Sequence, residues 1–243
     1  MKNEKPMKHG LIKAAAMLWI ASFMICGTGC HSTGYKKADV ASKGLQSGAA
    51  EVQTESQALQ DTMQALDSLV NKPASDLKPQ FVYFSKSLDS LNASAKRTDA
   101  TAKHMKKKNA AYLAAWDKQL SEMSYDYIRN QSEARKNEVS QRLQAVDQKY
   151  SEAQSTVQPL IDYLEDIRRA LSIDLTTAGL EVAKPIVAKA ADNAGKLQTA
   201  LANLAGELND SGARISTLVE QKSAPQSNAT PESPVETQRA EAK

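Results

Sequence analysis

The chain has 243 residues and a formal net charge of +3; 41% of its residues are hydrophobic and only 5% are aromatic. Four lysines and one acidic residue lie within residues 1–29, so the rest of the chain carries equal numbers of basic and acidic residues. That balance removes the bulk-charge argument for nucleic-acid binding, and we expect no nucleic-acid partner. The length suits one sizeable domain.

Residues 1–29 have the pattern of an export segment. Lysines are spread over the first part, and the stretch from Ala14 to Cys26 is an apolar run with a single serine, Ser22. This run is too short to span a bilayer core, which takes about 20 residues. It fits the hydrophobic region of a secretory signal peptide instead, so we predict that residues 1–29 are a cleaved signal peptide.

Small residues lead directly into a cysteine in Gly27-Thr28-Gly29-Cys30. This arrangement resembles the lipobox of bacterial lipoproteins, whose Cys thiol receives diacylglycerol and whose leader is cut just before it. It departs from the usual lipobox at Gly27, where Leu is common, and Cys26 is a poorer candidate because Ile25 precedes it. The alternatives are an ordinary signal-peptidase site nearby or an uncleaved anchor. The resemblance implies lipid attachment at Cys30.

A mature chain that starts at Cys30 has no other thiol and therefore no internal disulfide. Residues 30–37 are then a lipid-anchored tether. His31 and Ser32 follow the cysteine, with no Asp directly after it. By resemblance to lipoprotein sorting, this implies the outer membrane of a Gram-negative cell, with the protein facing the periplasm.

The body of the chain is predicted to be helical. No glycine occurs from Ala49 to Ala178, and Ala, Leu, Gln, Lys and Glu, which favour helices, are frequent. Apolar residues recur at alternating steps of three and four, the 3.5-residue period of a coiled-coil seam. The seams run through Leu45, Ala49, Val52, Ser56, Leu59, Met63, Leu66 and Val70; Leu77, Phe81, Phe84, Leu88, Leu91 and Ala95; Val139, Leu143, Val146, Tyr150, Ala153, Val157, Leu160, Leu164, Ile167 and Leu171; and Leu180, Ala183, Val187, Ala190, Ala194, Leu197, Leu201, Leu204, Leu208, Ser211, Ile215 and Leu218.

Breaks in these seams predict four helices, over about 38–70, 77–122, 126–173 and 177–221. Ser75 or Asp76 is expected to cap the second helix, and Thr176 or Thr177 the fourth. At ~1.5 Å per residue, each of the longer three would measure roughly 65–70 Å. Short connections make neighbouring helices antiparallel. The predicted fold class is all-α, an elongated antiparallel coiled-coil bundle over 38–221.

Two prolines predict bends in the helices, and the C-terminal composition predicts a tail outside the bundle. Pro159 and Pro185 lie inside predicted helices and should bend them, or Pro185 marks a later helix start. After Lys222 the chain is rich in Pro, Ser and Thr and has one aliphatic residue beyond Ala. We therefore predict that residues 222–243 are a disordered tail.

Short segments spread over residues 36–221 carry a further resemblance through their order and spacing: Leu77-Lys78-Pro79-Gln80-Phe81 with Phe84, Asn109 with Tyr112 and Trp116, Ile128-Arg129, Ser132-Glu133-Ala134-Arg135, Val139, Gln158-Pro159-Leu160, Asp166-Ile167, Ala170-Leu171-Ser172, Asp174-Leu175-Thr176 and Gly179. Together they are similar to an uncharacterised family, a domain of unknown function, of Gram-negative bacterial envelope lipoproteins. The resemblance implies a helical, membrane-attached periplasmic protein and implies no activity.

Residues for catalysis or metal binding are scarce. His104 is the only histidine after residue 31, whereas a zinc site takes three or four Cys, His or carboxylate ligands and a di-iron bundle takes two Glu-x-x-His pairs. Carboxylate pairs such as Asp162 with Asp166 are typical of solvated helix faces, and no Gly-rich phosphate loop occurs. We predict no metal, no cofactor and no enzymatic activity; a hydrolase would need a carboxylate-lined pocket.

The stretch from Lys96 to Lys108 is unevenly charged. It holds a single Asp, and Lys96, Lys103 and Lys107 fall near one helix face. Such a surface suits lipid phosphates, lipopolysaccharide, the acidic peptides of peptidoglycan or an acidic partner helix. The alternative is a solvated stretch neutralised by acids of adjoining helices. The candidate anion-binding residues are Lys96, Arg97, Lys103, Lys106, Lys107 and Lys108.

Aromatic residues and small seam residues allow for contacts with a partner or a second copy of the chain. We expect Trp116 in the core, whereas Tyr125 and Tyr127 either pack the end of the bundle or offer a surface to a partner. Small seam residues permit close helix approach and hence self-association: Ala183, Ala190, Ala194 and Ser211.

The sequence thus predicts a lipid-anchored periplasmic protein that acts as a non-enzymatic spacer, scaffold or adaptor. Its expected partner is an envelope protein or a second copy of itself. The alternative function is a binding module for an anionic envelope ligand through residues 96–108.

Overall fold

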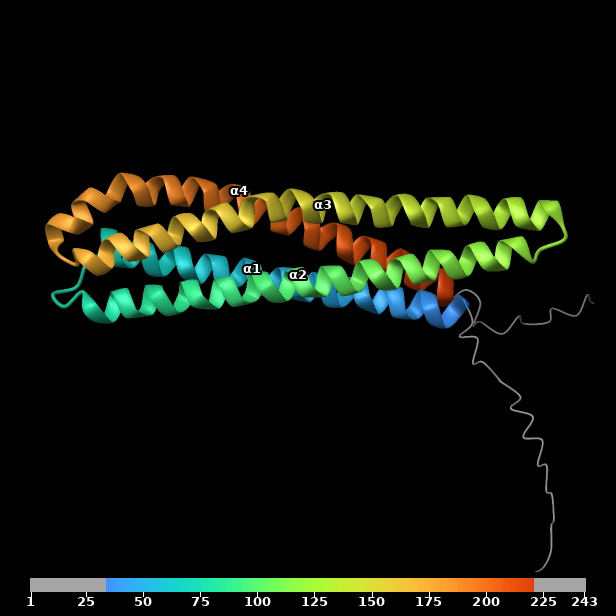
Figure 1. The fold of residues 1–243 in the computed structure, drawn as a ribbon, viewed down its shortest axis with the longest axis horizontal. Coiled ribbons are helices and arrows are strands. Elements are labelled where there is room, and N and C mark those ends of the chain that lie inside the picture. Colours follow the sequence, from blue (N-terminus) through green and yellow to red (C-terminus); the bar gives the residue numbers. More distant parts are fainter. Residues whose placement is uncertain (1–33, 221–243) are drawn as a thin grey trace, which may run out of the picture. The chain divides into compact units, whose positions relative to one another are not determined.

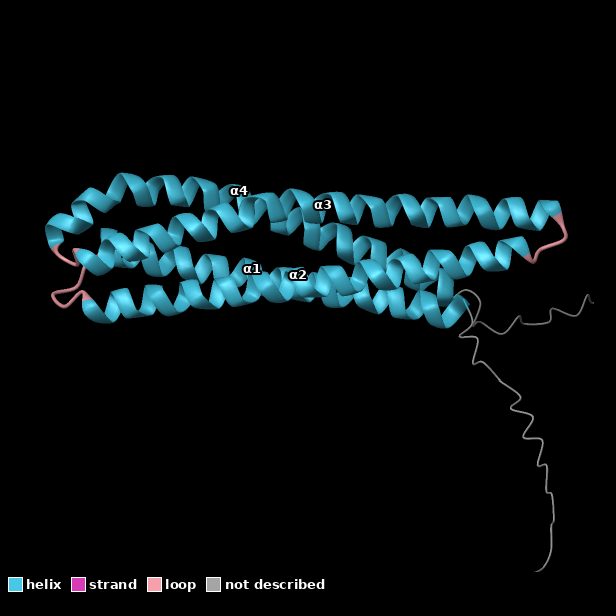
Figure 2. Cartoon of the chain, in the orientation of Figure 1, coloured by secondary structure: helices cyan, strands magenta, loops and turns pink. Residues whose placement is uncertain are grey.

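The computed structural model describes the backbone of residues 34–220 and the side chains of residues 36–217. Residues 1–33 and 221–243 lie outside this part, and with them the predicted signal peptide, Cys30 and the whole of the predicted tail. The described chain forms four α-helices and no strand, which confirms the predicted all-α class (Figure 2). The helices are α1 Gly34–Asn71, α2 Lys78–Ser121, α3 Asp126–Ile173 and α4 Thr177–Glu220.

The four helices form an antiparallel bundle in which each helix packs against two others. Helix α1 contacts α2 and α4, and α3 contacts the same two helices, whereas the described helices make no contact across either diagonal. The α1–α2 and α3–α4 turns lie at one end of the bundle, and the α2–α3 turn lies at the other (Figure 1). The predicted bundle of antiparallel helices is therefore confirmed.

The predicted seams form the core. In α3, nine of the ten seam residues are buried, and Tyr150 is half-buried. In α4, Leu197, Leu201, Leu204 and Leu208 are each 1% exposed. The small seam residues are buried as well, so the close approach that they permit takes place inside the bundle: Ala183, Ala190, Ala194 and Ser211. Self-association stays a prediction.

Gln80 closes the α1–α2 turn. Its side-chain oxygen accepts a hydrogen bond from Ala74 N at 2.8 Å, and its Nε2 donates to the carbonyl oxygens of Ser68 and Lys72 at 3.0 and 3.1 Å. The prediction that Ser75 or Asp76 is the N-cap of α2 is wrong: the N-cap residue is Leu77, which makes no side-chain cap hydrogen bond, and Asp76 Oδ1 accepts from Lys78 N at 3.0 Å. One amide side chain, that of Gln80, thus joins the end of α1 to the turn and to the start of α2.

Thr176 and Gly179 shape the α3–α4 turn. Thr176 Oγ1 accepts a hydrogen bond from Gly179 N at 3.1 Å, the N-cap interaction of α4. A Cβ atom on Gly179 would lie 2.3 Å from the carbonyl oxygen of Asp174, so only glycine fits here. The predicted cap at Thr176 or Thr177 is therefore Thr176.

Both internal prolines lie within continuous helices. Pro159 is inside α3 and Pro185 is inside α4, which begins at Thr177, so Pro185 does not start a helix. Helix α3 changes direction in its C-terminal half and α4 near its N-terminal end (Figure 1). These bends agree with the loss of one backbone hydrogen bond at each proline.

Candidate functional site

The start of α1 and the end of α4 lie side by side. Ser42 Oγ donates to the carbonyl oxygen of Gly212 at 2.9 Å, and Gln198 Nε2 donates to Ser56 Oγ. In these two antiparallel contacts the residue numbers have the same sum, so both give the same register between α1 and α4. This register places Gly34 level with about residue 220. Both ends of the described chain therefore leave the same end of the bundle, and Gly34 follows Cys30 by only four residues (Figure 1).

The basic stretch lies on the exposed surface of α2, and acids already neutralise half of it. Arg97 pairs with Glu51 of α1 at 3.6 Å, and Lys106 pairs with Asp147 of α3 at 3.2 Å. Lys103 binds Asp99 one turn earlier in α2 at 2.6 Å.

The remaining lysines of the stretch are exposed: Lys96, Lys107 and Lys108. Within residues 36–217, no carboxylate lies within 4.0 Å of their ammonium groups. The structure therefore divides the predicted anion-binding set. Three members hold helices or turns together, and three remain on the surface. His104, between them, is also exposed.

A polar cluster that sequence reasoning missed lies beneath this stretch, in the middle of the bundle. Tyr150 OH of α3 donates to Asp99 Oδ1 of α2 at 2.8 Å. Glu55 of α1 is 2% exposed, and its Oε1 has no hydrogen-bond partner. We name Glu55, Thr98, Asp99 and Tyr150 the mid-bundle polar cluster.

Burial and hydrogen bonds perturb the acids of this cluster in opposite directions. Burial raises the pKa of Glu55, an effect that a hydrogen bond with Thr98 partly offsets. The hydrogen bond from Lys103, and then the one from Tyr150, lowers the pKa of Asp99. Burial, and then the bond to Asp99, raises the pKa of Tyr150. Asp99 is therefore the well-solvated partner of a cation, and Glu55 is a carboxyl held in apolar surroundings.

The seam pattern explains why Glu55 was missed. From Val52 the seam reaches Leu59 through either position 55 or position 56, and Ser56 was the predicted core residue. The structure buries Glu55 instead and leaves Ser56 half-buried. A glutamate is expected on the surface from its charge alone. Only the register between α1 and its neighbouring helices shows that Glu55 faces the core.

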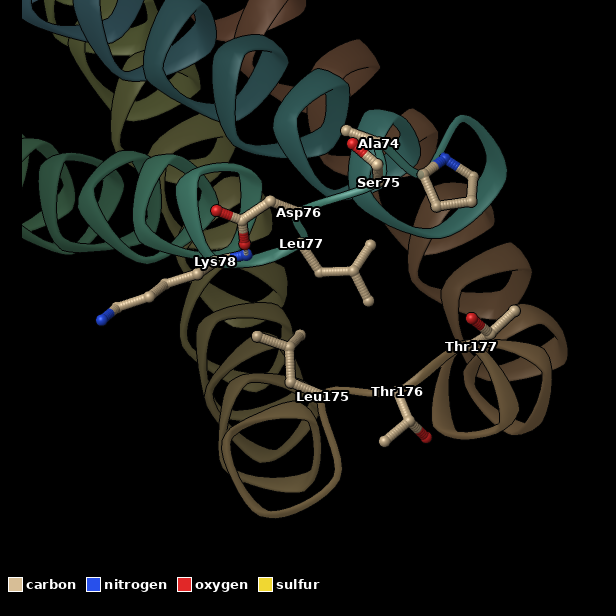
Figure 3. Close-up of a pocket in the computed structure, with 9 residues that line it drawn as sticks. Ala74, Ser75, Asp76, Leu77, Lys78, Leu175, Thr176 and Thr177 are labelled. Carbon is tan, nitrogen blue, oxygen red and sulfur yellow. Dashed lines mark hydrogen bonds between the residues drawn. The ribbon is translucent and has the colours of Figure 1, made fainter.

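An open depression lies between the two turns at the end of the bundle away from Gly34. It measures about 770 Å³. Leu77 and Leu175 lie in its opening, and the Lys78 ammonium points away from it (Figure 3). Its walls come from the α1–α2 turn and the α3–α4 turn: Pro73, Ala74, Ser75, Asp76, Leu77, Lys78, Leu175, Thr176 and Thr177. In the described residues, no group of three His, Cys, Asp or Glu side chains is placed to hold a metal ion.

At the opposite end, the aromatic residues of the α2–α3 hairpin separate into two sets. Trp116 is half-buried, and its ring lies 5.6 Å from that of Tyr112 between centroids, at an angle of 43°. Its Nε1 donates to Ser132 Oγ at 2.9 Å. Tyr125 and Tyr127 are 76% and 77% exposed. Of the two predicted roles for these tyrosines, packing the bundle end is wrong, and a surface role remains.

Comparison with known proteins gives one match. A family model described as "Protein of unknown function (DUF2959)" matches residues 28–229. The chain belongs to the DUF2959 family. No curated protein and no solved structure matches the chain. The family model covers the whole bundle and begins two residues before Cys30.

Proposed function

We propose that this DUF2959 protein is a lipid-anchored helical rod that acts as a non-enzymatic spacer, scaffold or adaptor in the bacterial envelope. It faces the periplasm, and its lipid lies in the outer membrane. The observation that carries this proposal is the position of Gly34: the first described residue lies near one end of the rod, the end that holds the α2–α3 turn, four residues after Cys30 (Figure 1).

The lengths of the tether and of the helices set the distance of each end of the rod from the membrane. Four extended residues reach at most about 14 Å, so a lipid on Cys30 holds the Gly34 end of the rod near the membrane. Helix α4 has 44 residues. At 1.5 Å per residue it is roughly 66 Å long, so the Leu77–Leu175 depression would stand several tens of ångströms from the bilayer.

The packing supports a stiff rod. One apolar core runs through all four helices, from Ala38 near the start of α1 to Ile215 near the end of α4. Ion pairs join separate helices along its surface, including Arg97–Glu51, Lys106–Asp147 and Arg168–Asp89. A rod of this kind keeps a fixed distance between the membrane and whatever binds its far end.

The two cysteines provide a matched test of the anchor. Cells that express the wild-type chain, Cys26→Ala or Cys30→Ala are fed an alkyne fatty acid. We expect label in the wild type and in Cys26→Ala, and none in Cys30→Ala, which should also keep its leader and migrate more slowly. Fatty-acid label in Cys30→Ala, or unchanged migration, would contradict the proposal.

The second candidate function is binding of an anionic envelope ligand by the basic stretch. It is favoured by the exposure of Lys96 and Lys107 on one face of α2 without an ion pair in the described structure. Replacing Lys96, Lys107 and Lys108 with Gln in a Cys30-free protein tests it, with Lys118, Lys189 and Lys196 as the matched control. This candidate requires loss of binding to peptidoglycan or to anionic vesicles in the first set alone.

A further inference from the structure

The tip of the α2–α3 hairpin exposes large apolar side chains on an ordered turn. Tyr125, Tyr127 and Ile128 are 76%, 77% and 56% exposed. Arg129 fixes the turn beneath them, because its Nη1 donates to the carbonyl oxygen of Met123 at 3.3 Å and its Nη2 pairs with Asp126. Arg129 and Asp126 are thus paired within the turn, while its apolar side chains are exposed.

This tip extends past the start of α1. Thr98 Oγ1 donates to the carbonyl oxygen of Glu51, and a Cβ on Gly48 would lie 3.4 Å from Met105 Sδ. In this antiparallel register Gly34 is level with about residues 115–119 of α2. The last turn of α2 and the turn at 122–125 therefore project roughly 5–12 Å beyond the start of α1, as Figure 1 shows.

We propose that Tyr125, Tyr127 and Ile128 insert into the headgroup region of the same bilayer that holds the Cys30 lipid. The proposal rests on the lipid-anchored function above. It gives the rod a second membrane contact, which sets the direction in which its far end points.

Chain reach and register together bring the tip to the bilayer. A lipidated Cys30 lies at the membrane surface, and the tether holds Gly34 at most about 14 Å above it. The tip projects toward the membrane by a comparable distance. The apolar residues at the far end, Ile173 at 87% exposed and Val182 at 71%, are separated from the anchor by the length of the bundle.

The chemistry of the tip fits a lipid surface. Tyrosine has an apolar ring and a polar hydroxyl, which is why it is enriched where membrane meets water. Residues 118–129 contain two basic and two acidic side chains: Lys118, Arg129, Glu122 and Asp126. The tip is therefore neutral, and we expect insertion to depend on apolar contact and to be insensitive to anionic lipid and salt.

A fluorescent label at the turn measures this insertion. Ser124→Cys supplies the only unmodified thiol of a mature chain lipidated at Cys30. The lipidated protein, labelled with an environment-sensitive dye, is reconstituted in phosphatidylcholine–phosphatidylethanolamine vesicles with and without brominated acyl chains. We expect a blue-shifted emission that the brominated lipid quenches, and neither effect for the same dye at Ser75→Cys in the far turn.

Matched variants identify the residues responsible. Replacing Tyr125, Tyr127 and Ile128 with Ser should abolish the shift and the quenching. Replacing the equally exposed Ile173 and Val182 with Ser should leave both unchanged. A Ser124 label that stays in water on a lipidated protein would overturn the proposal, and so would protection that appears only in native membranes with their proteins, which would identify a protein partner instead.

The mass of the N-terminal peptide is measured in the same sample. An unmodified Cys30 would contradict the proposed function. A lipidated Cys30 with an unshifted Ser124 label would contradict the tip insertion alone.

Discussion

The α1–α4 and α2–α3 interfaces of the bundle are built differently. Between α1 and α4, leucines and small residues pack closely, and the sites of Gly48 and Gly212 are filled by Leu208 and Leu45. Between α2 and α3, contact is less extensive and includes the hydrogen bonds Tyr150–Asp99 and Trp116–Ser132 and three ion pairs. Those ion pairs are Asp89–Arg168, Lys106–Asp147 and Asp117–Lys136.

The two interfaces therefore differ in what they contribute: α1–α4 stabilises the bundle, and the α2–α3 hairpin exposes the tip residues. Burial of leucines at α1–α4 stabilises the rod more than the exposed ion pairs of α2–α3 do, because apolar burial outweighs exposed ion pairs. The α2–α3 hairpin has the smaller interface, which carries several polar contacts, and it ends in the exposed tip. Changes at the two interfaces should therefore differ in size and in kind.

The largest expected effect is at the α1–α4 interface. Leu208→Ala, at a residue 1% exposed, removes packing against α1 and should lower the free energy of unfolding by about 2–5 kcal/mol. Leu120→Ala, at a residue 8% exposed in the last turn of α2, should cost only about 1 kcal/mol. Urea denaturation followed by circular dichroism measures both. Equal costs would contradict the division between the interfaces.

In the mid-bundle polar cluster, a substitution at Glu55 should raise the free energy of unfolding instead of lowering it. Burial raises the pKa of Glu55 above its ordinary value of 4.5, so its neutral form is favoured in the fold. The stability linked to this group is present below pH 4.5 and is lost as pH rises through the raised pKa.

Glu55→Gln should remove that pH dependence and raise the free energy of unfolding at pH 7 by about 1–3 kcal/mol, because it removes a buried charge whose Oε1 has no hydrogen-bond partner. Glu51→Gln, at the half-buried acid one turn earlier, is the control. Denaturation curves at several pH values distinguish the two. A destabilised Glu55→Gln protein at pH 7 would show that the carboxylate has a partner.

The smallest expected effect is at the ion pairs of α2–α3. Arg168 binds Asp89 at 2.7 Å, and the Asp89 side chain is 67% exposed. A double-mutant cycle with Arg168→Met and Asp89→Asn should give a coupling of about 0.2–1 kcal/mol that decreases in high salt. A coupling several-fold larger would give α2–α3 a share of the stability that the comparison assigns to α1–α4.

Periodicity predicted the helices and most of the core because both depend on spacing within a single segment. Leu201 and Leu164 could be placed in the core from their own helices alone. The exchange of Glu55 for Ser56 could not be predicted, because it depends on the register between helices. The same holds for the pairing of Lys106 with Asp147, which lies on a different helix.

The candidate sites were predicted only in part, because their pairing and exposure also depend on the register between helices. The basic stretch is visible in the sequence, but the acids that neutralise half of it come partly from α1 and α3. The sequence singled out Tyr125 and Tyr127 but left two roles open for them, packing the bundle end or offering a surface to a partner. Their exposure beyond the start of α1 follows only from the lengths and registers of all four helices.

The most direct test of the anchored rod is photocross-linking from its two ends in intact cells. A photoreactive amino acid replaces Ser124 in one strain and Ser75 in another, and the cross-linked products are identified by mass spectrometry. The account predicts lipid adducts from position 124, and envelope-protein or cell-wall adducts from position 75. Lipid adducts from position 75, with none from position 124, would contradict it.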